Sequence, residues 1–405
     1  MEKTNAKPLR IGINASFLRK PNTGIGQVSL NFLKKLSEVE SGKLKVEKEC
    51  EFVLYLEEDV KLDLLPNFKK EVFLPLWKRD DLIRKVWWEM FSLPRRAQKD
   101  GCDVLLSLYQ CPTVSPAQMP HIMVAHDIIP KLFPDYLNNW RKKLYWVLTE
   151  RALKKASRLV AVSHRSEKDL VRTLAVDSAK VAVCYVAADE IFGKEVSKEE
   201  KEQVLAKYGL KQGYIYHGGG LEVRKNAEGV LRAYKILLGD KGKLLEVPQL
   251  VVSGKLMPEL APLITDVQEL AQGLGIAHKV KFLGFVPQED LPALYRAAGV
   301  FVYPSRYEGF GLPTLEAMHQ GTPVITAKTS SLPEVGSDAV LYVDPEDMDE
   351  LAKVMRKVLS DNQLAQTLSL RGSQRAAKFT WDRFVSKIMA IISDETAKNK
   401  AVRSF

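Results

Sequence analysis

The hydrophobic positions of this chain alternate between short apolar runs and longer segments with helical spacing. Each run of strand length is followed by an amphipathic segment of helix length, almost to the end of the sequence. Short apolar runs bounded by turn residues predict buried strands, and their alternation with helices is typical of a doubly wound parallel sheet. In the first half we expect strands at 10–15, 51–56, 103–106, 121–125, 158–162 and 180–184.

A change of character after Val186 divides this pattern into two series. Residues 194–207 are highly charged, and a second α/β series follows. Its expected strands are 214–216, 249–252, 279–283, 300–303, 323–326 and 340–343. We therefore predict two Rossmann-like domains facing each other across a cleft: 1–190 and 214–378, joined by a linker at 191–213 with one exposed helix.

The composition is that of a globular protein with a basic first half. Of 405 residues, 46% are hydrophobic and 27% charged, and the net charge is +10. Residues 1–190 hold 32 Lys and Arg against 24 Asp and Glu, an excess of +8. Such an excess attracts anions, whether phospholipid, lipid diphosphate, nucleotide or nucleic acid. No nucleic-acid-binding motif is present, so we expect no nucleic-acid partner.

Nothing in the sequence predicts a spanning or exported protein. There is no run of about 18 apolar residues, and residues 1–8 lack the apolar core of a signal peptide. The 4 cysteines have neither metal spacing nor the density of a disulfide scaffold. We expect a cytoplasmic protein with reduced cysteines.

The strongest functional signal is an apolar strand that leads through a glycine loop into a helix. The loop holds Gly309 and Gly311, and the helix opens at Pro313. Free N–H groups at a helix start favour an anion, and glycines let it approach the backbone. Glu308 and Glu316 bracket the loop with seven residues between them. Because a carboxylate accepts hydrogen bonds from a diol, the stretch predicts a site for a phosphorylated sugar.

A second glycine loop precedes two cations. Residues 218–220 are all glycine, and Arg224 and Lys225 follow shortly afterwards. One interpretation is a flexible turn with an exposed basic pair; the other is that both cations neutralise a diphosphate. We find no Asp-x-Asp at a strand end to hold a divalent ion. We therefore expect no metal and no cofactor, with the two cations in their place.

The first domain offers two further signals. His126 follows the strand at 121–125, and such a position is either structural or part of a ligand site at the carboxyl end of the sheet. Gly24 and Gly26 nearly match a dinucleotide fingerprint, which here ends in Ser29. The acid expected about 20 residues later falls in a Lys/Glu-rich loop, which speaks against NAD. We expect a glycine loop that lets substrate approach the backbone.

Two segments, 84–91 and 140–146, mix aromatic and basic residues. In the first segment and just before it, Ile83, Trp87, Met90 and Phe91 fall on one helical face. The simpler interpretation is a core face with a solvated basic edge. The alternative is a membrane-surface patch, because Trp and Lys or Arg gather at the headgroup level.

Together these motifs resemble the retaining glycosyltransferases of family four, which have the GT-B fold. The resemblance covers the chain from Ile11 to about Trp381 and is most specific in the second half. It rests on Glu308-x7-Glu316 with its Gly-Phe-Gly-Leu-Pro, on 331–335, 283–287 and 219–226, and on His126-Asp127.

The resemblance implies that the second domain binds a nucleotide-diphosphate sugar. Glu316 would accept the ribose hydroxyls, and Glu308 those of the transferred sugar. Arg224 and Lys225 would hold the diphosphate. The other donor contacts would come from loops and the base pocket, namely Gly220, Phe285, Val286, Gly309, Phe310, Gly311 and Leu312.

The resemblance also implies roles for the first domain. His126 would contact the transferred sugar, so that His126, Glu308, Arg224 and Lys225 form the catalytic set. The loop with Gly24 and Gly26 would lie over the diphosphate or the acceptor. Residues 379–405 would contain a helix that crosses back to the first domain. Independently of the resemblance, we expect the residues from about 394 to fray, as chain termini often do.

The expected function is that of a retaining, metal-independent hexosyltransferase in cell-surface polysaccharide synthesis. Mannose from GDP-mannose would go to a glycan or lipid-linked acceptor at the inner face of the membrane. A UDP-glucose or UDP-N-acetylglucosamine donor stays open within the same fold. Outside this class, an inactive nucleotide- or glycan-binding scaffold and an NAD-binding Rossmann protein stay open. The intact acids and cations speak against the scaffold.

Overall fold

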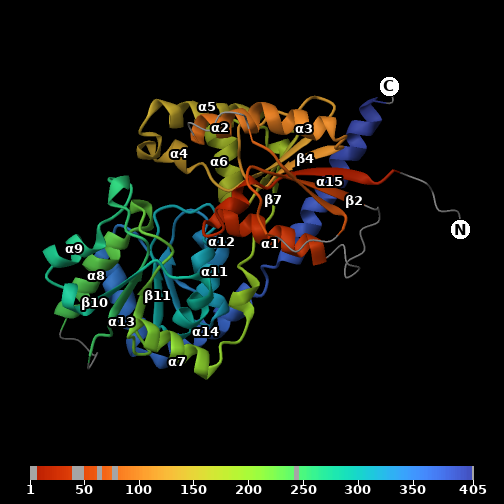
Figure 1. The fold of residues 1–405 in the computed structure, drawn as a ribbon. Coiled ribbons are helices and arrows are strands. Elements are labelled where there is room, and N and C mark those ends of the chain that lie inside the picture. Colours follow the sequence, from red (N-terminus) through yellow and green to blue (C-terminus); the bar gives the residue numbers. More distant parts are fainter. Residues whose placement is uncertain (1–6, 39–49, 62–65, 75–80, 241–245, 404–405) are drawn as a thin grey trace, which may run out of the picture. The chain divides into compact units, whose positions relative to one another are not determined.

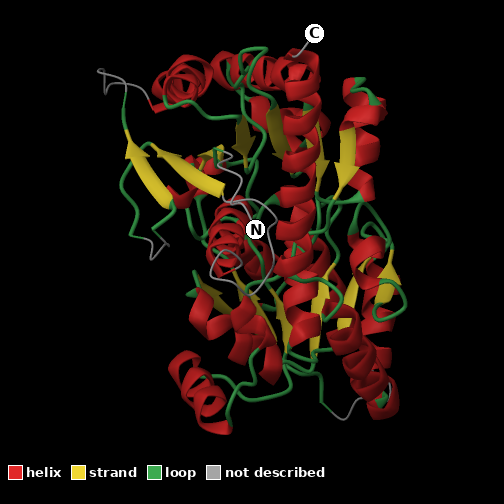
Figure 2. Cartoon of the chain, turned by 90° about the vertical axis from the view of Figure 1, so that its right-hand side faces the viewer, coloured by secondary structure: helices red, strands yellow, loops and turns green. Residues whose placement is uncertain are grey.

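The computed structural model describes residues 7–38, 50–61, 66–74, 81–240 and 246–403. The chain forms two compact units, one made of Met1–Val186 with Trp381–Phe405 and the other of Ala187–Thr380. The prediction of two doubly wound parallel sheets is confirmed, because each unit holds one such sheet with helices packed against it (Figures 1 and 2). Within the described ranges, no helix has both the length and the apolar content to cross a membrane.

The first unit is built on a parallel sheet of seven strands in the order β3-β2-β1-β4-β5-β6-β7. The interior strands β4 and β5 are buried along their whole length, as expected for a sheet covered on both faces. The strand order reverses between β1 and β4. The connection after β1 therefore runs toward one edge of the sheet, and the connection after β4 runs toward the other. The strands are β1 Leu9–Asn14, β2 Cys50–Leu56, β3 Phe68–Val72, β4 Val104–Ser107, β5 His121–Ala125, β6 Arg158–Ala161 and β7 Val181–Val183.

Strand β3 is missing from the sequence prediction. Its residues, FKKEV, are largely solvated at the edge of the sheet, so they show no apolar run. Only its pairing with β2 reveals it, for example where Phe52 aligns and stacks with Phe68 at 4.5 Å between ring centroids. An edge strand needs a single buried face, and here a single side chain supplies most of it.

Seven α-helices belong to the described part of the first unit. They are α1 Gly24–Glu38, α2 Asp81–Trp87, α3 Leu93–Lys99, α4 Ile129–Leu132, α5 Trp140–Lys155, α6 His164–Leu174 and α15 Trp381–Arg403. A π-helical turn, Trp88–Ser92, joins α2 to α3. The predicted core face of this region is wrong: Ile83 and Trp87 are exposed, whereas Trp88 and Glu89 are fully buried. The π turn adds a residue per turn, which rotates the buried face away from regular helical spacing.

The last helix, α15, returns to the first unit and packs on α1. Phe384 lies edge-on to Phe32 at 5.9 Å between ring centroids, and Lys35 pairs with Asp382 at 3.3 Å. The predicted fraying from residue 394 is wrong, because the helix continues to Arg403. Thr396 is buried, and the Asn399 side chain donates to the Gln118 carbonyl at 2.9 Å, so tertiary contacts hold this tail.

The second unit holds a parallel sheet of six strands in the order β10-β9-β8-β11-β12-β13. All six strands were expected within one or two residues of their observed positions. The order reverses between β8 and β11, and the loops that follow these two strands therefore diverge. In a doubly wound sheet, ligands bind at the carboxyl ends of strands at such a point. The strands are β8 Ile215–His217, β9 Leu250–Ser253, β10 Val280–Gly284, β11 Val300–Tyr303, β12 Val324–Ala327 and β13 Leu341–Val343.

Eight α-helices belong to the described part of this unit, and four of them, α8, α9, α13 and α14, form one core cluster with the strands. The segment 191–213, predicted as a linker, is part of the second unit. Its exposed helix packs on α10 through Asp290, which accepts hydrogen bonds from Lys207 and Tyr208 at 2.6 Å each. The helices are α7 Lys198–Tyr208, α8 Ala227–Gly239, α9 Val267–Gly273, α10 Leu291–Ala297, α11 Leu312–His319, α12 Leu332–Gly336, α13 Met348–Ser360 and α14 Asn362–Ala376.

Candidate active site

The carboxyl ends of β8 and β11 bring the predicted residues of the second unit together. The glycine loop 218–220 leaves β8, and the loop 304–311 leaves β11 and enters α11. A Cβ at Gly219 would lie 2.8 Å from Pro313 Cγ, so the two loops are in contact. Gly219 and Gly220 have φ of +90° and +111°, a conformation that favours glycine. These glycines are therefore needed both for the turn and for the close approach.

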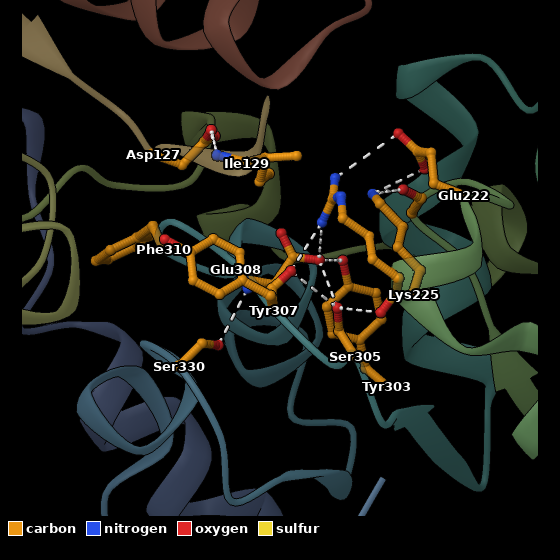
Figure 3. A network of polar contacts seen from close by, with 12 residues as sticks. Asp127, Ile129, Glu222, Lys225, Tyr303, Ser305, Tyr307, Glu308, Phe310 and Ser330 are labelled. Atoms are coloured by element: carbon orange, nitrogen blue, oxygen red, sulfur yellow. Dashed lines mark hydrogen bonds and ion pairs between the residues drawn. The ribbon is translucent and has the colours of Figure 1, made fainter. Parts of the chain in front are cut away.

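Glu308 lies at the centre of this site and is held by three donors (Figure 3). Its Oε1 accepts a hydrogen bond from Tyr303 at 2.6 Å and from Ser305 at 2.9 Å. The same oxygen lies 2.8 Å from the Arg224 guanidinium. All three contacts use Oε1, so Oε2 keeps its capacity to accept a hydrogen bond from a ligand hydroxyl.

The charge of Glu308 follows from these contacts. Burial by itself would raise the pKa of this carboxyl, since it disfavours the ionised form. The positive charges of Arg224 and Lys225 and the hydrogen bonds from Tyr303 and Ser305 outweigh burial and lower the pKa below its ordinary value. Glu308 is therefore an ionised acceptor at neutral pH.

The two predicted cations sit in a short 3₁₀ turn, Val223–Lys225, directly after the glycine loop. Lys225 donates to the Gly219 carbonyl, and both cations lie 3.7 Å from Glu222. Their side chains are each only 10% exposed. Partly buried cations attract an anion more strongly than solvated ones, because the surrounding dielectric constant is lower. The exposed basic pair that sequence reasoning left open is thus not what the structure shows.

The start of α11 presents backbone donors beside these cations. Gly311 caps the helix with φ of +106°, and Thr314 N–H donates to the Gly311 carbonyl at 3.1 Å. Across the part of the chain that the structure describes, the N–H groups of Gly311 and Leu312 have no acceptor in the protein. Such N–H groups at a helix start suit an anionic ligand.

Glu316 lies one turn into α11 and differs from Glu308 in its ionisation. Burial raises its pKa to about 7, although the hydrogen bond from Tyr295 to Oε2 at 3.0 Å opposes this shift. Its other oxygen, Oε1, is not used by that bond. The two acids therefore divide into one that is ionised at neutral pH and one that titrates near it.

The remaining donor-site candidates of the second unit lie on nearby loops. Val286 is buried and Phe285 is exposed after β10. Phe310 is buried against Phe379, at 5.7 Å between ring centroids. Ser331 donates to the carbonyls of Glu308 and Phe310, at 2.9 and 2.8 Å, and so fixes the loop that contains Gly309.

In the first unit, His126 lies at the carboxyl end of β5, as predicted. Its Nε2 donates to the Leu108 carbonyl at 2.9 Å, and burial lowers its pKa to about 4. A neutral ring that donates through Nε2 leaves Nδ1 as the acceptor nitrogen. His126 can therefore accept a hydrogen bond from a hydroxyl.

The glycine loop predicted at Gly24 and Gly26 is wrong, because both residues lie in the first turn of α1. Gly26 N–H donates to Thr23 Oγ1 at 3.1 Å, and a Cβ at Gly26 would lie 2.0 Å from the Lys20 carbonyl oxygen. Gly26 is thus needed for packing of the preceding loop, whereas a Cβ at Gly24 would meet open space. The Lys/Glu-rich loop that bears on NAD, 39–49, lies outside the described residues.

Sequence reasoning missed the groups that hold the two acids. Tyr303 and Ser305 flank Pro304 at the end of β11, and Tyr295 comes from α10. Hydroxyl residues at the end of a central strand are a usable signal, since the carboxyl end of the sheet is where ligands bind. No sequence pattern connects Tyr295 with Glu316.

Comparison with known proteins gives a consistent result over most of the chain. Residues 197–375 match the family model described as "Glycosyl transferases group 1", and residues 52–190 match "Glycosyltransferase Family 4". The O-antigen chain mannosyltransferase B of Escherichia coli is 30% identical over 381 residues, which cover 90% of this chain and 94% of that protein. The O-antigen chain mannosyltransferase RfbU of Salmonella typhimurium is 26% identical over 376 residues, which cover 91% and 96%.

The fold has solved counterparts at lower identity. Anabaena Alr3699/HepE in complex with UDP-glucose superimposes with a TM-score of 0.70 at 18% identity, covering 96% of this chain and 100% of that one. At this identity the likeness concerns the fold.

Proposed function

This chain belongs to glycosyltransferase family 4 and is a hexosyltransferase with the GT-B fold, and from that premise we propose that it transfers mannose from GDP-mannose. The acceptor in this proposal is a glycan or a lipid-linked glycan in the synthesis of a cell-surface polysaccharide. The choice of sugar is supported by the two mannosyltransferases of O-antigen chains that match over nine tenths of the sequence.

The observation that carries the proposed mechanism is the use of one oxygen of Glu308 by three protein donors. Oε2 of this rigidly held carboxylate then accepts a hydrogen bond from a hydroxyl of the transferred sugar. Positioning of this kind accelerates transfer, because the sugar is held in the reacting geometry before the bond to the diphosphate breaks.

Arg224 and Lys225 hold the diphosphate in this proposal. Negative charge grows on the diphosphate as the bond to the anomeric carbon breaks, and two cations with 10% exposed side chains stabilise that charge. The N–H groups of Gly311 and Leu312 add two donors. We propose that these groups do the work that a divalent metal does in other phosphate sites.

The nucleoside occupies the remaining part of the site. The ionised carboxylate of Glu316 accepts hydrogen bonds from the ribose hydroxyls. Phe285 and Val286 line the base pocket. His126 accepts a hydrogen bond from a hydroxyl of the transferred sugar through Nδ1. The transfer retains the anomeric configuration. The roles of Gly24, Gly26 and Gly220 next to the donor remain predictions.

We place the reaction in the cytoplasm, at the inner face of the membrane. A lipid-linked acceptor is carried by that membrane, and the basic excess of the first 190 residues favours an anionic surface. This placement is independent of the donor and is tested separately below.

Two measurements test the donor and the reaction. In thermal unfolding with GDP, UDP, ADP and NAD, GDP should stabilise the protein most, by about 2.7 kcal/mol at 100 times its Kd. In transfer assays on a water-soluble mannoside, GDP-mannose should be consumed and a longer glycan formed. Consumption of UDP-glucose or UDP-N-acetylglucosamine alone would establish the alternative donor. Binding of GDP without any transfer would support a scaffold, and stabilisation by NAD alone would overturn the proposal.

A further inference from the structure

Helix α5 presents an apolar stripe to solvent in addition to the one it buries. Trp146, Thr149, Ala152 and Leu153 face the core of the first unit. On the opposite side, Trp140, Leu144 and Val147 are 65%, 48% and 60% exposed. Their spacing of four and then three residues aligns them along one helical face. In Figure 1, α5 runs along the outer surface of its unit.

Basic residues surround this stripe. The helix carries six basic residues against one acidic residue, Glu150, which gives a net charge of +5 over 16 residues. The acid is already neutralised, since Lys131 and Lys154 lie 3.6 and 2.9 Å from it. On the helical wheel, Arg151 continues the exposed apolar face, with Lys154 and Lys155 on either side of it.

We infer that this face of α5, defined by Trp140, Leu144, Val147 and the basic residues beside them, docks on an anionic lipid surface. The apolar side chains enter the boundary between headgroups and acyl chains, and the cations contact the headgroup phosphates. Trp140 is placed at the first turn, where an indole can lie at the headgroup level. The inference deepens the membrane placement proposed above and rests on it.

The charge distribution argues against the other occupants. In a symmetric dimer the same patch meets itself, so two helices of charge +5 would be brought together. Nucleic acid would satisfy the cations but would leave the exposed tryptophan, leucine and valine in water. A lipid surface satisfies both kinds of side chain at once.

The test is co-flotation of the full chain with vesicles, at low and high salt. Vesicles of phosphatidylcholine mixed with the anionic lipid phosphatidylglycerol are compared with vesicles of phosphatidylcholine alone. The wild type should float with the anionic vesicles at low salt, and much less with neutral vesicles or at high salt.

Two variants separate the stripe from general surface hydrophobicity. Trp140→Ser/Leu144→Ser/Val147→Ser should reduce the partition coefficient at least about tenfold, given the apolar area removed. The matched control, Leu370→Ser/Val402→Ser, removes exposed apolar side chains from α14 and α15 and should float like the wild type. Both variants should unfold at the wild-type temperature and transfer sugar to a water-soluble acceptor at the wild-type rate.

Three results would overturn the inference: flotation of the triple variant at the wild-type level, absence of wild-type flotation on anionic vesicles, and equal flotation on neutral ones. Concentration-dependent dimerisation that the triple variant abolishes would show a second copy to be the occupant. Transfer is measured on a soluble acceptor, so it does not depend on membrane docking. A negative flotation result would therefore not contradict the proposed reaction, and a negative transfer result would not affect the flotation test.

Discussion

Replacement of Tyr303 by Phe tests whether the hydroxyl groups at the end of β11 hold Glu308 ready for the sugar. The change removes the donor that lies 2.6 Å from Glu308 Oε1 and leaves the ring in place. The ring packs against Phe301 at 5.7 Å between centroids, so the fold is expected to survive. Arg224 and Ser305 still contact the same oxygen.

The expected loss follows from the type of hydrogen bond. A bond to a charged acceptor contributes about 1.5–3 kcal/mol, and each 1.36 kcal/mol in the barrier is a factor of ten in rate. The full contribution would correspond to roughly 10- to 100-fold in kcat/KM. Since two other donors remain on Oε1, we expect a loss near the lower limit.

The pH profile gives a second readout with a definite sign. The bond from Tyr303 lowers the pKa of Glu308, because it stabilises the ionised form. Without it the carboxyl protonates at higher pH, so activity should fall more at acidic pH than at pH 8. Tyr234→Phe is the matched control: its hydroxyl donates to the Pro248 carbonyl at 3.0 Å in the core, away from Glu308.

Steady-state transfer rates and thermal unfolding of the three proteins decide the matter. The Tyr234 variant should lose stability and keep kcat/KM. The Tyr303 variant should keep its stability and lose kcat/KM. If Tyr303→Phe keeps kcat/KM within about twofold and an unchanged pH profile, Glu308 does not depend on this hydroxyl, and the positioning argument fails.

Three further predictions concern packing, ionisation and metal. Gly26→Ala should destabilise the protein by about 1–3 kcal/mol, because the new Cβ would clash with the Lys20 carbonyl. The free energy of unfolding of Gly24→Ala should lie within about 0.5 kcal/mol of that of the wild type. Equal unfolding midpoints of the two variants in denaturant would contradict this prediction. Affinity for GDP, measured by calorimetry, should rise roughly several-fold from pH 6 to pH 8, because the pKa of Glu316 is about 7 and its ionised form accepts the ribose hydroxyls. Glu316→Gln should flatten that rise, and a variant as pH-dependent as wild type would exclude the role. Treatment with EDTA should leave the transfer rate unchanged, and recovery of a lost rate by Mg²⁺ or Mn²⁺ would show that the two cations do not suffice.

The ionisation of Glu316 also affects stability. Burial raises its pKa from the ordinary value of 4.5 to about 7 in the folded state. The folded protein therefore loses stability as the pH rises from 4.5 to about 7, because the unfolded chain releases this proton more readily. Such a cost at a binding site is typical of groups kept for function. The Glu316→Gln variant should therefore melt several degrees above wild type at pH 8 and close to it at pH 5.

Local patterns determined most of the fold. The buried strands of both sheets are short apolar runs, and all strands except β3 were visible as such. The donor-site motifs were also readable, because a helix start, its glycines and the acids beside it are close in sequence. Glu308, Gly311 and Glu316 are held within a single strand-loop-helix segment, so their proximity needs no knowledge of distant contacts.

Only the tertiary structure decided how those residues behave. The ionisation of Glu308 depends on Arg224, 84 positions away, and that of Glu316 on burial beside Tyr295. The start of α1 and the need for Gly26 follow from a close backbone approach that no spacing reveals.

The two faces of α5 show the same division. Periodicity places apolar residues on a helix, but only packing against the rest of the unit decides which are buried. Here Trp146 is covered while Trp140 is left in solvent. The sequence alone determined the family, the sheets and the chemical groups of the site. The tertiary structure decided their charge, their partners and their exposure, because these depend on residues that meet only when the chain folds.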